Sequence, residues 1–227
     1  PADVRKGKFV IVLHTMERNY PWGTLRSTFS SKTKVVLEEK GLPYRVERVR
    51  IGDVWKKVPE VLAKNPLGKV PTLVHHAAEG DRVVSEAAAI CTYLAEQHPE
   101  AGLLPTPAES GHYHRWLFFA AGPLEQAVVG KAMGWEVPEG KTGMAGFGSL
   151  DLALDALDGW LSQNDFVAGG RFTMADTYVG SQFVWGLRFG SIPERPSFRA
   201  YVDRITQRAA YIEANAIDAA IIKAAQG

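Results

Sequence analysis

The chain has 227 residues, 46% of them hydrophobic and 22% charged, which is enough to bury the core of one large domain or two small ones. Its 26 Lys and Arg nearly balance its 25 Asp and Glu, so charge gives no reason to expect nucleic acid or an anionic membrane as a partner. No apolar run approaches the roughly 20 residues that cross a bilayer. The single cysteine, Cys91, excludes an intrachain disulfide framework and a cysteine-based metal site, and it fits a reducing, cytoplasmic setting.

The first hundred residues alternate between strand and helix patterns. Residues 8–14 indicate a strand rather than a signal peptide, because no small-residue cleavage site follows them. The patterns predict strand, helix, strand, helix, strand, strand and helix, in that order, at residues 8–14, 30–42, 44–51, 54–65, 69–76, 81–86 and 86–99. The helices between strands imply a crossover, and the short Gly-containing turn between the last two strands implies an antiparallel hairpin.

The character of the chain changes near residue 99. Pro99, Pro105 and Pro107 mark residues 99–110 as a linker. The segments beyond it show helical patterns only, at residues 113–133, 146–164, 174–190 and 195–225. The prediction is therefore an α/β domain at 1–98, a linker at 99–110 and an all-α domain at 111–227.

Four segments, taken in their order and spacing, resemble the glutathione transferase family. They are residues 27–44 (STFSSKTKVVLEEKGLPY), 65–74 (NPLGKVPTLV), 83–99 (VVSEAAAICTYLAEQHP) and 166–179 (FVAGGRFTMADTYV). The resemblance covers nearly the whole chain. It implies a thioredoxin-like N-terminal domain followed by an all-helical C-terminal domain, glutathione as co-substrate, a homodimer and a role in detoxification.

Pro71 interrupts a strand-like run, and a proline cannot donate to a sheet ladder. The resemblance implies that the Val70–Pro71 bond is cis, so that the backbone of Val70 pairs with the cysteinyl residue of glutathione like an added strand. The alternative is a trans proline at a sheet edge. Lys57 and Lys69 are candidates for the glycyl carboxylate of glutathione, or else ordinary surface lysines.

Glu86 and Ala87 match the family's site for the γ-glutamyl end of glutathione. Glu86 stands at the acidic position, but Ala87 replaces the usual serine, so it would bind through its main-chain N–H at a helix N-terminus. The alternative is that Ser85 and Glu86 only cap the helix.

The chemistry needs a thiolate, and the family stabilises it with a hydroxyl or thiol after the first strand. Alignment of the first helix puts Ser27 at the serine position, with Ser30 as the alternative and Tyr20 third. No cysteine occurs between residues 15 and 31, which argues against the members that use Cys for disulfide exchange. The loop before Ser27 is unusually long.

The second half offers residues for two further roles. Thr173 and Asp176 form a predicted capping box with Phe172 as hydrophobic staple, which assigns Asp176 to stability. Tyr113 and Trp116, together with Tyr20 and Arg188, are predicted to line an apolar site for the second substrate, although some of the crowded aromatics must be core. Arg188 lies in an apolar helical run, so it either points into that cleft or pairs with an Asp or Glu.

The sequence thus predicts an enzyme, a glutathione transferase that joins the glutathione thiolate to an electrophilic apolar substrate. No HExxH motif or carboxylate cluster supports a metal site. The alternatives are a glutathione-dependent isomerase, dehalogenase or peroxidase on the same fold, or a non-catalytic binding protein of this family.

Overall fold

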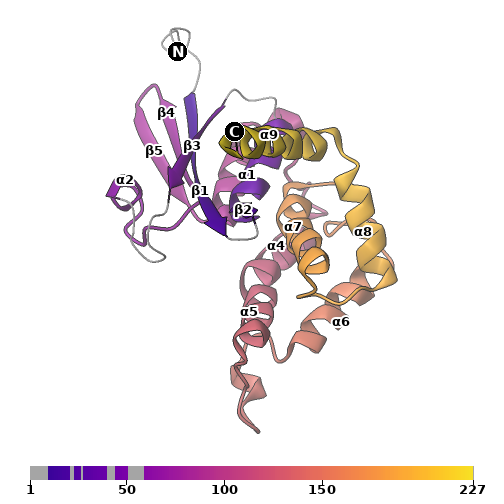
Figure 1. The fold of residues 1–227 in the computed structure, drawn as a ribbon. Coiled ribbons are helices and arrows are strands. Elements are labelled where there is room, and N and C mark those ends of the chain that lie inside the picture. The colour runs from indigo at the N-terminus through magenta and orange to yellow at the C-terminus, as the bar shows by residue number, and fades with distance from the viewer. Residues whose placement is uncertain (1–9, 21–22, 27, 40–43, 51–58, 227) are drawn as a thin grey trace. The chain divides into compact units, whose positions relative to one another are not determined.

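The computed structural model describes residues 10–20, 23–26, 28–39, 44–50 and 59–226 (Figure 1). Contacts divide the chain into two compact units. The first, here the sheet unit, combines Pro1–Ala101 with the C-terminal stretch Ala209–Gly227. The second, the helical unit, is Gly102–Arg208.

The sheet unit follows the predicted alternation of strands and helices, with one strand added. Its elements are β1 (Val10–Tyr20), β2 (Gly23–Arg26), α1 (Thr28–Glu39), β3 (Tyr44–Arg50), α2 (Pro59–Leu62), β4 (Thr72–Ala77), β5 (Gly80–Ser85), α3 (Ala87–Gln97), the 3₁₀ turn Pro99–Ala101 and α9 (Ala209–Gln226). β3 pairs parallel with β1, whereas β4 pairs antiparallel with β1 and β5 antiparallel with β4. The predicted crossover and hairpin are both present.

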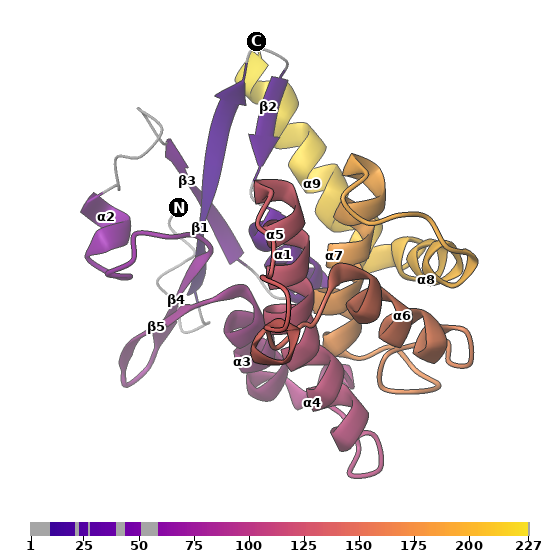
Figure 2. The same ribbon diagram turned by 90° about the horizontal axis from the view of Figure 1, so that it is seen from below.

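The added strand, β2, forms a hairpin with the far end of β1 (Figure 2). The sequence predicted a strand ending at residue 14 and a long loop, but β1 continues to Tyr20 and the chain returns as β2. The loop prediction is therefore wrong for residues 15–20 and 23–26. The polar run Glu17–Asn19 lacks the apolar alternation that is typical of a strand. Its strand conformation depends on backbone hydrogen bonds to β3 and β2, which residue propensities do not indicate.

The core of the sheet unit lies between β4, α1 and α3. Leu73 of β4, Leu37 of α1 and Ile90 of α3 are all fully buried. Cys91 is fully buried too, as free cysteines often are in protein cores.

The C-terminal helix groups with the sheet unit and not with the helical unit. The pattern at 195–225 predicted helix within the C-terminal domain, but the chain breaks between α8 (Pro196–Thr206) and α9, and α9 packs on α1. Lys34 of α1 is buried and forms an ion pair with Asp218 of α9. This pair neutralises a lysine that would otherwise be too costly to bury.

The helical unit contains the expected helices, with longer connecting segments between α5 and α6 and between α6 and α7 than elsewhere. Its elements are α4 (Ser110–Phe119), the π-helical turn Ala120–Leu124, α5 (Glu125–Met133), the 3₁₀ turn Thr142–Met144, α6 (Leu150–Leu161), α7 (Met174–Phe189) and α8. The π turn contains Pro123, which has no N–H to donate to a regular α-helical ladder. None of the helices described is long and apolar enough to cross a membrane.

The start of α7 carries the predicted capping box, which the structure confirms. Asp176 is fully buried and accepts hydrogen bonds from the Thr173 backbone N–H at 2.8 Å and the Thr173 hydroxyl at 3.0 Å. The Val167 N–H donates to it at 2.8 Å and the Tyr201 hydroxyl at 3.0 Å. Burial raises the pKa of the Asp176 carboxyl to about 6, although all four donors favour its charged form.

A second carboxylate ties the start of the helical unit to the loop before α7. Arg171 donates to the two carboxylate oxygens of Glu109 at 2.9 and 2.7 Å, and also to the carbonyls of Gly102 and Leu104 at 2.5 and 2.6 Å. The hydrogen bond from Arg171 lowers the pKa of Glu109 to about 2. A guanidinium suits this position because its fork meets a carboxylate and carbonyls at once.

Candidate functional site

Sheet register brings two distant loops to the same edge of β1. His14 of β1 pairs with Thr72, the first residue of β4, and Glu17 pairs with Arg26, the last residue of β2. His14 and Glu17 also pair with β3. A strand residue has one neighbour on each side, so β2 and β4 both lie on the side of β1 that faces away from β3. Three residues along a strand cover roughly 10 Å. The Val70–Pro71 segment and the start of α1 therefore approach each other at this edge.

The third segment joins them through the β4–β5 hairpin. Thr72 pairs with Ser85, the last residue of β5, so Glu86 and the start of α3 follow immediately beside Pro71. One end of the sheet thus collects the start of α1, the loop before β4 and the start of α3. These are three of the sites that the sequence predicted for glutathione.

The Val70–Pro71 peptide bond is cis, which confirms the prediction. The loop around it is held by a buried amide that sequence reasoning missed. Asn65 donates to the Lys69 carbonyl at 3.0 Å and accepts from the Leu67 N–H at 3.1 Å, while the Thr72 hydroxyl donates to the same Lys69 carbonyl at 3.0 Å. The Asn65–Pro66 pair is a turn signal that could have drawn attention to this residue.

Glu86 has an unusual backbone conformation at the start of α3. Its φ is 70° and its ψ is 124°, a region that residues other than glycine rarely adopt. Its side chain is exposed and makes no capping hydrogen bond, so the alternative of a simple helix cap is wrong for Glu86. Strained positions of this kind concentrate at functional sites.

The first turn of α3 leaves backbone donors without an acceptor inside the helix. The first helical bond runs from the Ile90 N–H to the Glu86 carbonyl at 2.8 Å, so the N–H groups of Ala87, Ala88 and Ala89 precede the ladder. Such donors, with the positive end of the helix dipole, favour a carboxylate. An exposed acid and backbone donors that lie outside the helical ladder are therefore neighbours at the start of α3, an arrangement complementary to the two charges of a zwitterionic amino acid.

The residues predicted for the second substrate fall in different environments. Tyr113 and Trp116 are 1% and 0% exposed in the core of the helical unit, and Trp116 packs on Trp160 with ring centroids 6.0 Å apart. They do not line an open site, and that part of the prediction is wrong. Aromatics occur on every face of α4, so periodicity could not show which of them point inward.

Arg188 lies exposed at the end of α7, and its guanidinium is 5.8 and 5.7 Å from the ring centroids of Trp185 and Phe189. Among the residues described, the structure gives it no ion pair, so the predicted Asp or Glu partner is replaced by aromatic faces.

Comparison with known proteins decides the family. Residues 26–97 match the model of the glutathione S-transferase N-terminal domain, and residues 124–209 match that of the C-terminal domain. This chain belongs to the glutathione S-transferase family. The matches confirm the predicted enzyme class and the predicted fold, a thioredoxin-like domain followed by a helical one.

Several relatives extend the likeness over most of the transferase chain. Glutathione S-transferase 3 of Zea mays is 29% identical over 195 residues, which are 79% of this chain and 85% of that protein. The glutathione transferase structure from Methylococcus capsulatus (TM-score 0.66, 28% identity) covers 90% of this chain and 96% of that one. A sphingomonad glutathione S-transferase, solved with glutathione, has a TM-score of 0.66 and 26% identity, with 89% and 96% covered.

Other predicted site residues of this transferase are described only in part. Ser27 and Lys57 lie outside the described residues. Tyr20 is the last residue of β1 and Ser30 lies in the first turn of α1, but only their backbone is described. The side chain of Lys69 is exposed at the cis-proline loop. Within the described parts of the chain, no three His, Cys, Asp or Glu side chains are grouped so that they could hold a metal ion.

Proposed function

We propose that this protein catalyses attack of the glutathione thiolate on an electrophilic carbon of an apolar substrate. The observation that carries the proposal is the convergence, at one end of the sheet, of the start of α1, the Val70–Pro71 loop and the start of α3. In the reaction the thiolate sulfur supplies the electron pair of a new C–S bond. In a substitution the bond between carbon and the leaving group breaks and the leaving group departs with that pair; in an addition the pair of the activated double bond moves away from the attacked carbon and is then protonated. Glutathione is the co-substrate.

The γ-glutamyl end would bind at the start of α3. The exposed carboxylate of Glu86 is free to meet the amino group, and the N–H groups of Ala87 and the next two residues would meet the carboxylate. A backbone donor does not need the serine hydroxyl that Ala87 lacks. The departure from the family pattern at Ala87 is therefore compatible with binding.

The rest of glutathione would extend along the cis-proline loop. β4 begins at Thr72, so Val70 precedes the ladder and its backbone is available for an added strand. Lys69, exposed on the same loop, is placed to attract the glycyl carboxylate, and Lys57 is the second candidate.

The thiolate would lie near the start of α1. A thiol with a pKa of about 8.5 is mostly protonated at neutral pH, and lowering that pKa by two units takes about 2.7 kcal/mol of preferential thiolate stabilisation. We assign the hydroxyl donor to Ser27, with Ser30 as the alternative, and the dipole of α1 adds to its effect.

The test is a titration of bound glutathione, followed by the ultraviolet absorbance of its thiolate across pH. Wild type, Ser27→Ala and Ser30→Ala are compared, with Ser31→Ala as a matched control on the same helix. Ionisation well below the free thiol, reversed only by Ser27→Ala, supports the proposal. Reversal only by Ser30→Ala moves the donor by one turn, and wild type without a bound thiolate overturns the proposed chemistry.

We also propose a homodimer. Support comes from large apolar side chains exposed on the helical unit, of which Phe118 of α4 and Leu152 of α6 are 68% and 63% exposed. Sedimentation equilibrium of wild type should give a dimer, and Phe118→Glu or Leu152→Glu should shift it toward the monomer. A wild-type monomer at all concentrations would exclude this assembly.

A further inference from the structure

The connection between β5 and α3 is a single residue. β5 ends at Ser85 and α3 begins at Ala87, so Glu86 alone turns the chain from the sheet into the helix, with a φ of 70°. A residue other than glycine keeps such a conformation only where the surrounding structure over-determines it. A capping hydrogen bond does not do so, because the Glu86 side chain makes none. The constraint therefore comes from farther along β5 and α3.

The two strands of the hairpin and α3 meet again at the hydroxyl of Tyr93. His75 of β4 pairs with Arg82 of β5 in the sheet register, so their side chains leave the same face of the sheet. The Tyr93 hydroxyl lies 2.5 Å from Nδ1 of His75, and a hydrogen bond with Tyr93 raises the pKa of Arg82 above its usual value. Arg82 also donates at 3.4 Å to the side chain of Gln97, one turn farther along α3. We name Tyr93, His75 and Arg82 the Tyr93 network.

Hydrogen bonding in the Tyr93 network has a defined direction. Burial lowers the pKa of His75 and the charge of Arg82 lowers it further, so the imidazole is neutral at pH 7 and its Nδ1 can accept. The guanidinium of Arg82 can only donate, so the Tyr93 oxygen accepts from it and the hydroxyl hydrogen is donated to His75. His75 is 3% exposed, so water does not readily replace this donor. One hydroxyl thus joins both strands to the helix.

The network lies at a similar distance from Glu86 along both elements. Tyr93 follows Glu86 by seven helical residues, a rise of roughly 10 Å, and Arg82 precedes it by four strand residues, roughly 13 Å. Strand and helix are therefore joined by one residue at one end and by side-chain hydrogen bonds farther along. Relaxation of the Glu86 backbone would change the angle between them and separate Tyr93 from the hairpin. The hydrogen bonds of the network oppose that movement.

We propose that the Tyr93 network holds Glu86 in its strained conformation and so positions the first turn of α3 for the γ-glutamyl end of glutathione. Tyr93 is then a positioning residue that acts through Glu86. The ligand in this inference rests on the proposed function. The coupling between Tyr93 and Glu86 does not, because it belongs to the fold of the sheet unit and can be measured without any ligand.

The experiment is a double-mutant cycle between Tyr93→Phe, which removes only the hydroxyl, and Glu86→Gly. The folding equilibrium constant of the full-length protein is measured by urea denaturation without glutathione. Glu86→Gly should raise this constant about fivefold in wild type, because glycine relieves the strain, but less than about twofold in the Tyr93→Phe background, where the strain is already released. Glutathione affinity, measured by calorimetry, should fall about threefold in Tyr93→Phe.

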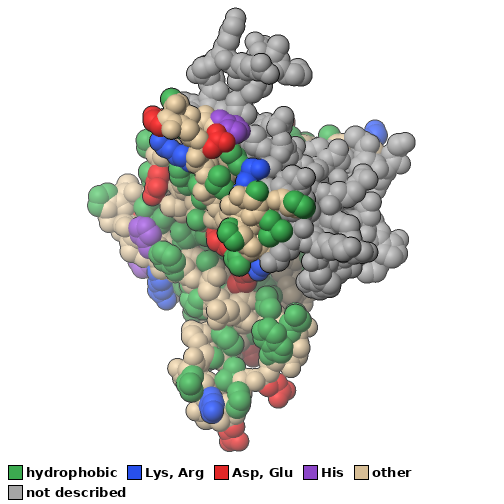
Figure 3. Space-filling model, turned by 90° about the vertical axis from the view of Figure 1, so that its left-hand side faces the viewer, with side chains coloured by type: hydrophobic (Ala, Val, Ile, Leu, Met, Phe, Trp, Pro, Cys, Tyr) green, Lys and Arg blue, Asp and Glu red, His purple; other side chains and the backbone are tan. Residues whose placement is uncertain are grey.

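Arg82→Met tests the network from the strand side. The Arg82 side chain is 46% exposed, and Figure 3 shows charged and histidine side chains gathered over the upper part of the face in view, where the β4–β5 hairpin lies. Methionine keeps an aliphatic stem and removes the donors, so this variant disturbs no core packing. The effect of Glu86→Gly should shrink in the Arg82→Met background as well.

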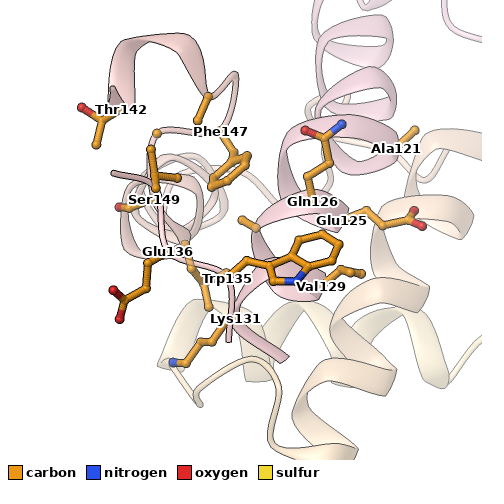
Figure 4. Close-up of a pocket in the computed structure, with 16 residues that line it drawn as sticks. Ala121, Glu125, Gln126, Val129, Lys131, Trp135, Glu136, Thr142, Phe147 and Ser149 are labelled. Carbon is orange, nitrogen blue, oxygen red and sulfur yellow. The ribbon is translucent and has the colours of Figure 1, made fainter. Parts of the chain in front are cut away.

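Two control variants leave the network intact. Thr92→Val removes a neighbouring hydroxyl of α3, which donates at 3.0 Å to the Ala88 carbonyl within the helix. Trp135→Ala removes an exposed ring at the hollow between α5 and α6 of the helical unit (Figure 4). In both backgrounds Glu86→Gly should keep its effect of about fivefold, because distant substitutions act additively.

Two results would overturn the proposal. One is additivity of Tyr93→Phe and Glu86→Gly. The other is a Thr92→Val background that shrinks the glycine effect as much as Tyr93→Phe does, which would indicate general loosening of α3.

Failure of the network and failure of the proposed function can be told apart. Coupling of Tyr93 to Glu86 in a wild type that does not bind glutathione would support the hold on Glu86 and overturn the proposed function. Glutathione binding by wild type together with additive effects would overturn the role of the network and leave the proposed function in place.

Discussion

Two helix starts in this molecule place an acid in opposite situations. At the start of α7, Asp176 is fully buried and accepts four hydrogen bonds from its own chain. At the start of α3, Glu86 is exposed, makes no capping bond and holds a strained backbone with φ of 70°. Glu86 immediately precedes an apolar helix and Asp176 lies in the first turn of another, so composition alone does not distinguish their roles.

The difference shows how structural and binding roles diverge. At the start of α7, the Asp176 carboxylate is paired with donors from within the fold, so these hydrogen bonds stabilise the helical unit. At the start of α3, the Glu86 carboxylate makes no capping hydrogen bond and the first backbone N–H groups lie outside the helical ladder. The backbone of Glu86 is also strained, and strain of this kind is usually kept where it contributes to function. The predictions below test whether stability follows Asp176 and ligand affinity follows Glu86.

The largest expected effect comes from Asp176→Ala. It removes the acceptor of four buried donors, so the free energy of unfolding should fall by about 4 kcal/mol, measured by urea denaturation. The control is Asp151→Ala, an exposed acid in the first turn of α6, which should cost less than about 1 kcal/mol. Equal losses in the two variants would show that the α7 box does not anchor the unit.

The same carboxyl should give stability a pH dependence of unusual sign. Burial raises the pKa of Asp176 from 3.8 to about 6, so its contribution is full below pH 3.8 and is lost as pH rises through 6. This rise in the pKa of Asp176 corresponds to about 3 kcal/mol. Urea unfolding at a series of pH values should show the advantage of wild type over Asp176→Asn shrinking from pH 4 to 6. An advantage that grows over this range would mean that the four donors outweigh burial.

At the α3 start, Glu86→Gly should separate stability from function. Glycine adopts a φ of 70° without strain, which outweighs its larger unfolded-state entropy, so the free energy of unfolding should rise by about 1 kcal/mol. Glutathione affinity, measured by calorimetry, should fall about tenfold because the charged hydrogen bond is lost.

Glu86→Gln distinguishes the two effects of that substitution. It keeps the strained backbone and removes the charge, so affinity should fall while stability stays within about 0.5 kcal/mol of wild type. If Glu86→Gly gains stability and still binds glutathione like wild type, the strained backbone of Glu86 is not kept for glutathione binding.

Much of both helix starts could be predicted from sequence, because their signals are local. The spacing of Thr173 and Asp176 defines a capping box within four residues, and the structure confirms it. The cis bond at Pro71 and the strand–helix junction at Glu86 followed from short segments with the family's order. The strain at Glu86 could not be read, since a backbone angle depends on the sheet register that positions both ends of the junction.

Features that depend on distant pairing were missed. The β1–β2 hairpin has a polar, irregular sequence, and its partners β3 and β2 define it as a strand. The inward faces of Tyr113 and Trp116 depend on how α4 packs in its unit, and the grouping of α9 depends on α1 and the pair Lys34–Asp218. Ser27, the residue assigned to the thiolate, remains a prediction that only the titration tests.

The smallest expected effect concerns Glu109, which contrasts with Asp176 in the same unit. Hydrogen bonding to Arg171 lowers the pKa of Glu109 from 4.5 to about 2, so its contribution is present above pH 4.5 and is lost as pH falls toward 2. The pair is partly exposed, so Glu109→Gln should cost about 1 kcal/mol at pH 7, and this cost should shrink below pH 4.5. Glu100→Gln, whose carboxylate is more exposed, is the control and should change stability little. A cost that persists at low pH would mean that the hydrogen bonds of Arg171 to the Gly102 and Leu104 carbonyls, and not its ion pair with Glu109, account for the stabilisation. The pH dependence from Asp176 would keep its opposite slope.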